Sequence, residues 1–120
     1  GSEMCIRDSY LTHQLKSLTS IDHYNYNLYL LNAGYSKDAM ECYELLWEQQ
    51  ENKSSAFAFS VLTNLLVACL VSENEDKYLE YYQSLEEEDK EDSDIEVIHA
   101  QYIRWKQTGE PYNGPLGYEL

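Results

Sequence analysis

The sequence has few basic residues, and this shortage excludes two classes of partner. Lysine and arginine number 8 against 22 aspartate and glutamate residues, which gives a formal net charge of −14. Such a surface repels the phosphates of nucleic acids and the anionic head groups of lipids. We therefore expect neither nucleic acid nor a membrane as a partner. The negative charge would favour binding to a basic protein or peptide. Alternatively, it serves only to keep the chain in solution.

Cysteines, glycines and long apolar runs are also scarce. Cys42 and Cys69 fall on the apolar sides of predicted helices and are too few for a disulfide framework, which favours a reducing compartment, the cytoplasm. The longest apolar stretch, Val61 to Val71, is interrupted by Thr63 and Asn64 and is too short to span a bilayer. The few glycines form no phosphate-binding loop.

Residues 1–9 resemble the in-frame translation of a widely used transposase sequencing adapter at all nine positions. The alternative is a Gly-Ser cloning scar followed by a native Met4. We exclude this segment from fold reasoning, and we expect the native polypeptide to begin near Tyr10 with its own N-terminus missing. A signal peptide further upstream therefore stays open. Without the two acidic residues and one basic residue of the segment, 20 acidic and 7 basic residues remain, a net charge of −13.

Apolar residues recur at helical spacing along nearly the whole chain, and no strand-like alternation stands out. The spacing predicts helices over about residues 11–18, 21–33, 36–50, 55–71, 75–85 and 93–108. The helix over 55–71 is apolar on much of its circumference, which predicts the most buried element. For the acidic run from Glu86 to Asp94 we expect a solvated connector, because it lacks the glycine and the alternating oxygen ligands of a calcium loop.

Local signals predict where several of these helices begin and end. Ser20 and Asn74 are suitable N-caps, and Ser93 to Glu96 reads as a capping box. Gly34 and Gly109 stand where a left-handed residue closes a helix.

The spacing of Gly34, Ala39 and Tyr43 resembles the tetratricopeptide-repeat pattern, in which glycine ends the first helix and a small residue and an aromatic mark the second. Tyr78 and Tyr82 repeat the second-helix part 39 residues after Ala39 and Tyr43. The resemblance covers residues 20–108. It implies an all-α fold of antiparallel helical hairpins, stacked as a short α-α superhelix of five to six helices. The domain would cover residues 10–109, followed by an irregular tail at 110–120. An unrelated stack of helical hairpins is the alternative, because Tyr78 is large for its position and the offset exceeds the usual 34 residues.

No catalytic apparatus is evident, and we expect no enzyme activity, no cofactor and no metal ion. None of His13, His23 and His99 has a ligand-type partner three or four residues away on the same helix face. Cys69 and His99 could meet as nucleophile and base, but nothing near them indicates activation. We expect His99 to be a hydrogen-bonded histidine in the core or at its boundary.

The function that the resemblance implies is a protein-interaction module, which holds a peptide or partner protein in a concave groove. The register places two sets of residues toward that groove. From the fourth predicted helix they are Ser60, Thr63, Val67, Leu70 and Val71, and from the last they are Ser93, Glu96, Ala100, Ile103 and Arg104. An apolar floor with an acidic rim would suit a basic, amphipathic partner. Two alternatives remain: an acidic decoy or immunity-type inhibitor of a basic protein, and the structural end of a larger multidomain protein.

Overall fold

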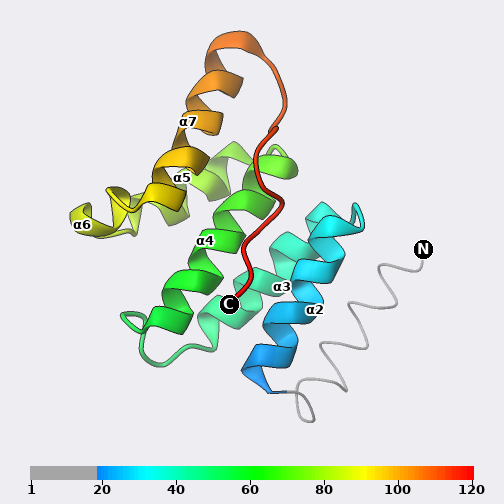
Figure 1. The fold of residues 1–120 in the computed structure, drawn as a ribbon, viewed down its shortest axis with the longest axis vertical. Coiled ribbons are helices and arrows are strands. Elements are labelled where there is room, and N and C mark those ends of the chain that lie inside the picture. The colour runs from blue at the N-terminus through cyan, green and yellow to red at the C-terminus, as the bar shows by residue number, and fades with distance from the viewer. Residues whose placement is uncertain (1–18) are drawn as a thin grey trace.

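The computed structural model describes residues 19–120, and all regular structure in that range is helical (Figure 1). The helices are α2 (Ser20–Asn32), α3 (Ser36–Glu48), α4 (Ala56–Val71), α5 (Glu75–Gln83), α6 (Glu87–Lys90) and α7 (Ser93–Thr108). The predicted all-α fold is confirmed. The adapter-like segment and the helix predicted over 11–18 lie outside the described residues.

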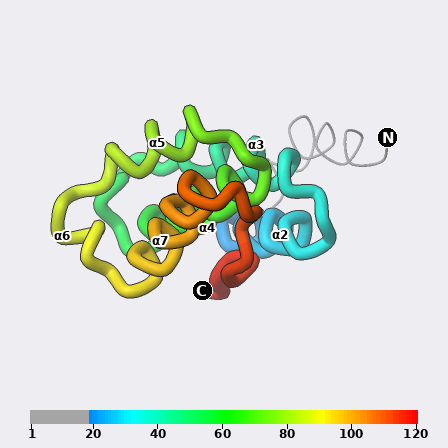
Figure 2. The backbone as a smooth tube through the Cα atoms, turned by 90° about the horizontal axis from the view of Figure 1, so that it is seen from above, coloured from blue at the N-terminus to red at the C-terminus, as the bar shows by residue number. Residues whose placement is uncertain are grey.

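The helices are arranged as hairpins around α4. Short turns join α2 to α3 and α4 to α5, and α4 contacts α2, α3, α5 and α7. Seen from above, α3 and α5 lie along one side, while α2, α4 and α7 lie along the other with the C-terminal end of the chain (Figure 2). The position of α4 between its neighbours explains why its sequence is apolar nearly all round.

Burial of α4 matches its composition. Every residue from Val61 to Leu70 is buried, including Leu65 and Leu66, which are fully inaccessible to solvent. The prediction that this helix is the most buried element is therefore confirmed. Its ten consecutive buried residues include two polar ones, Thr63 and Asn64.

Several predicted helix boundaries are confirmed. Asn74 caps α5 by accepting a hydrogen bond from the backbone N–H of Lys77 at 3.1 Å. Gly34 follows α2 with a φ of 95°, and Gly109 closes α7 with a φ of 76°. Both glycines occupy the left-handed region, which other residues rarely adopt.

Two predicted N-caps are wrong by one residue. Thr19, not Ser20, caps α2, because Asp22 completes a capping box with Thr19. Asp92, not Ser93, caps α7, and its carboxylate accepts from the backbone N–H groups of Asp94 and Ile95. A carboxylate at this position also suits the positive end of the helix.

The acidic connector differs from its prediction, because it contains the short helix α6. Lys90, the one basic residue of that helix, pairs with Glu87 at 3.2 Å. Beyond α7, the tail, defined here as residues 110–120, contains no helix. It turns back and runs down the molecule between α4 and α2 (Figure 1).

Candidate functional site

The tail lies against a small set of side chains from two helices, which we call the tail site. Figures 1 and 2 both show the end of the chain beside α2 and α4. The tail site consists of Tyr24, Leu28, Leu31 and Asn32 of α2 and Asn64 of α4. It holds residues 116–118 of the tail.

Asn64 binds the main chain of Tyr118 with both ends of its carboxamide. The Asn64 Oδ1 accepts from the Tyr118 N–H at 2.8 Å, and the Asn64 Nδ2 donates to the Tyr118 carbonyl oxygen at 3.1 Å. The hydroxyl of Tyr24 donates to the same carbonyl oxygen at 2.5 Å. These three bonds satisfy the main-chain groups of Tyr118 without contact to its side chain.

A buried tyrosine pair fixes Asn64 in place. Its Nδ2 lies 2.8 Å from the Tyr24 hydroxyl and 3.0 Å from the Tyr43 hydroxyl, and Tyr43 in turn donates to the Tyr24 carbonyl at 3.0 Å. Burial raises the pKa of Tyr24 to about 12, so this hydroxyl remains a neutral donor at physiological pH. The three side chains come from α2, α3 and α4, so the core of both hairpins orients the tail site.

Asn32 provides a further main-chain contact one turn along α2 from Leu28. Its Nδ2 donates to the carbonyl oxygen of Leu116 at 2.9 Å and to that of Leu28 at 2.9 Å. The tail site thus binds its occupant at two carbonyls and one N–H, all of them main-chain groups.

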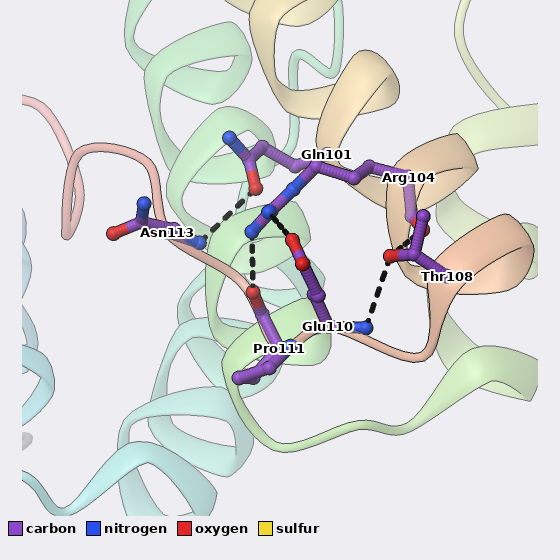
Figure 3. Close-up of polar contacts among 6 residues, drawn as sticks. All are labelled: Gln101, Arg104, Thr108, Glu110, Pro111 and Asn113. Carbon is purple, nitrogen blue, oxygen red and sulfur yellow. Dashed lines mark hydrogen bonds and ion pairs between the residues drawn. The ribbon is translucent and has the colours of Figure 1, made fainter.

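The start of the tail is attached to α7 by a second group of polar contacts (Figure 3). Arg104 forms an ion pair with Glu110 and donates to the Pro111 carbonyl oxygen at 2.8 Å. Gln101 accepts from the N–H of Asn113 at 3.0 Å. These contacts turn the chain back toward α4 directly after helix α7 ends.

Of the residues predicted to face a groove, those on α4 are mostly interior. Val67 and Leu70 are buried in the core, and Thr63 is buried with its hydroxyl donating to the Phe59 carbonyl at 2.8 Å. Ser60 and Val71 are half-buried. In the arrangement described here, Thr63, Val67 and Leu70 contribute to packing and present little surface to a partner.

The predicted residues on α7 are accessible. Ser93, Glu96, Ala100 and Ile103 are exposed, and Ile103 retains 43% of its accessible surface. Arg104 is half-buried, and it contacts the tail directly. Arg104 is thus the predicted site residue that the structure brings to the tail.

Ser60 lines a cavity of about 590 Å³. Its lining includes Trp47, Phe59 and Lys53, together with the carboxylates of Glu86 and Glu88. Among the described residues these two carboxylates have no ion-pair partner. At the other end of the acidic run, burial raises the pKa of Tyr118, and the charges of Asp94 and Asp92 add to this shift.

His99 lies at the edge of the core, as predicted. Its Nδ1 is 2.8 Å from the Tyr78 hydroxyl, and its ring stacks on Tyr82 with centroids 4.1 Å apart. Cys69 is buried, and burial raises the pKa of its thiol to about 12, the opposite of the shift that activates a nucleophile. Within residues 19–120, no cluster of three His, Cys, Asp or Glu side chains is placed to hold a metal ion.

Sequence reasoning missed Asn64, the central residue of the tail site. The available signal was a carboxamide in the middle of the most apolar helix, since a buried amide needs hydrogen-bond partners. The sequence gives no indication that one of those partners is a residue of the tail.

No protein-family model, no curated protein and no solved structure matches this chain. In the part of the chain that the structure describes, no helix has both the length and the hydrophobicity that crossing a membrane requires. The geometry of the tail site is therefore the basis for a functional argument.

Proposed function

We propose that this chain is a non-enzymatic protein-interaction module that holds an extended peptide segment of a partner at the tail site. The observation that supports this most is the pair of hydrogen bonds between Asn64 and the main chain of Tyr118. Because these bonds use main-chain groups only, a segment of another protein could form the same bonds. The hairpins around α4 would then be a degenerate tetratricopeptide-like stack.

A basic partner fits the charge of the surroundings. The chain carries a formal net charge of −14. Glu86 and Glu88 line the cavity near Ser60 and have no ion-pair partner within residues 19–120. Negative charge around a binding site accelerates the encounter with a cationic ligand and is screened by salt. Cys42 and Cys69 are buried, and neither forms a disulfide within residues 19–120, which suits a reducing compartment, and we propose the cytoplasm.

The proposal is tested by binding kinetics at two salt concentrations. The probe is a labelled decapeptide of alternating lysine and leucine with one central Gly–Tyr step, the two residues that the tail itself places at the site. It is basic and amphipathic. Replacing Glu86, Glu87 and Glu88 with glutamine should slow association. Asn64→Ala should instead accelerate dissociation, because the main-chain bonds are lost. The matched control, Glu73→Gln with Asp76→Asn and Glu80→Gln, removes three exposed charges elsewhere.

The outcomes separate this function from the second candidate, an acidic inhibitor of a basic protein. The exposed glutamates of α6 favour that second candidate. It predicts binding that depends on Glu86 to Glu88 and is indifferent to Asn64. Failure of the peptide to bind at either salt concentration, or binding equally affected by the control variant, would contradict the interaction module.

A further inference from the structure

The tail site selects its occupant at one position by size and backbone conformation. Gly117 has a φ of 93°, a conformation that residues with a side chain rarely adopt. A Cβ at this position would lie 2.6 Å from Leu28 Cδ1, 3.3 Å from Leu31 Cδ2 and 3.5 Å from Asn64 Cγ. The chain therefore passes close to α2 and α4 in a backbone conformation that favours glycine, and a Cβ there would require the Leu28 side chain to shift.

The residue after this glycine is recognised differently. Its main chain is bound by Asn64, and the half-buried ring of Tyr118 packs against the hydrophobic core. The residue before the glycine, Leu116, contributes its carbonyl oxygen to Asn32 while 39% of its surface stays exposed. Of the three consecutive residues, Gly117 is thus restricted by its backbone conformation, and Tyr118 packs its ring against the core.

The tail is attached in a way that permits release. No backbone-to-backbone hydrogen bond among the described residues joins the tail to a helix, since its main-chain bonds go to side chains. Pro115, Leu116, Glu119 and Leu120 are exposed. Tyr112 and Tyr118 pack against the core, but a segment without backbone pairing opens at a lower free energy than the helical core.

We propose that the tail site recognises a glycine followed by an aromatic residue in an extended segment of a partner protein, and that residues 116–118 are an internal ligand of this kind. This inference rests on the proposed function and names its ligand. The partner's Gly–aromatic step replaces Gly117 and Tyr118, so the tail must leave before the partner binds.

The experiment uses the full chain and a labelled peptide with the sequence of residues 111–120. We measure fluorescence anisotropy with the unaltered chain and with Gly117→Ala, which strains the attached tail and frees the site more of the time. The unaltered peptide should bind Gly117→Ala about tenfold more tightly than it binds the unaltered chain. The same peptide with alanine at the position of Gly117 should bind about tenfold more weakly than the glycine peptide.

Two controls isolate the mechanism. A peptide with glutamine at the exposed position of Glu119 should bind like the unaltered peptide. In the chain, Asn64→Ala should abolish the preference for the glycine peptide, whereas Gln83→Ala, which removes an exposed amide on α5, should leave the preference unchanged. The two peptides are compared on one chain, so the comparison stays decisive even when Gly117→Ala lowers stability.

Equal affinity of the glycine and alanine peptides would overturn this inference, and so would equal binding to the unaltered chain and to Gly117→Ala. If the lysine–leucine peptide still bound through Asn64 in that case, the proposed function would stand without its Gly–aromatic selectivity. If neither that peptide nor the tail peptide bound, both proposals would fail.

Discussion

The carboxamide of Asn64 pairs with both main-chain groups of Tyr118, a residue 54 positions away in the sequence. A carboxamide presents one donor and one acceptor side by side, as a peptide group of a neighbouring strand does. Asn64 therefore gives an extended segment the pairing of a sheet edge inside an all-helical structure.

This pairing predicts slow hydrogen exchange at one amide of the tail. The Tyr118 N–H should exchange more slowly than the N–H of Leu120, which has no hydrogen-bond acceptor among the described residues. Asn64→Ala should remove the difference, and hydrogen–deuterium exchange followed by NMR would measure it. Protection of Tyr118 that survives in Asn64→Ala would show that other contacts hold the tail.

Leu65→Ala should be among the most destabilising substitutions in the chain. Leu65 is fully buried on α4, so its truncation leaves a cavity and should cost roughly 2–5 kcal/mol in the free energy of unfolding. Ile103→Ala on the exposed face of α7 is the control and should change stability by only about 0.5 kcal/mol. Urea denaturation measures the loss in the free energy of unfolding for both variants. Similar losses would show that Leu65 is not on the buried face of α4.

Asn27→Leu should stabilise the fold. Asn27 is fully buried on α2, and neither its Nδ2 nor its Oδ1 has a hydrogen-bond partner among the described residues. A buried amide without partners costs roughly 1–3 kcal/mol, and leucine has a similar volume without that cost. A higher melting temperature is the expected result. A lower one would reveal that a buried water molecule satisfies Asn27.

His99 should make the free energy of unfolding depend on pH near neutrality. Burial, assisted by the charge of Lys90, lowers the pKa of His99 below its usual value of 6.5. The unfolded chain then binds a proton at a higher pH than the folded chain, so stability decreases as the pH falls through about 6.5. Urea titrations from pH 7.5 to 5.5 should give a smaller slope for His99→Gln than for the unaltered chain. Equal slopes would mean that His99 is not the group responsible.

Much of the fold could be predicted from the sequence, because helical periodicity and capping act over a few residues. The apolar pattern around Leu65 predicts a central helix, and that helix is buried. Asn74 begins α5 because its side chain caps the helix, and Gly109 ends α7 because glycine adopts the left-handed conformation. The N-cap of α7 was misassigned because Asp92 and Ser93 are adjacent and both can cap. Only the backbone conformation decides between them.

The candidate site was less predictable, because it depends on contacts between residues far apart in the chain. The register taken from the resemblance places Val67 and Leu70 in a groove. Because α4 packs against α2, α3, α5 and α7, both residues are instead buried. The tail was predicted to be irregular from its prolines and glycines. Its return to Asn64 depends on the turn that Arg104 holds after α7, and no local pattern encodes that turn.

The attachment of the tail to α7 has a quantitative consequence for any partner. A segment joined to its own site by a short connection competes as if it were present at roughly millimolar concentration. A free ligand of equal intrinsic affinity would have to approach that concentration to displace it, so single weak motifs are rejected. A partner with a second point of attachment avoids this threshold, because its own motif then also competes at a high local concentration. The exposed glutamates of α6 offer such a second attachment to a basic protein.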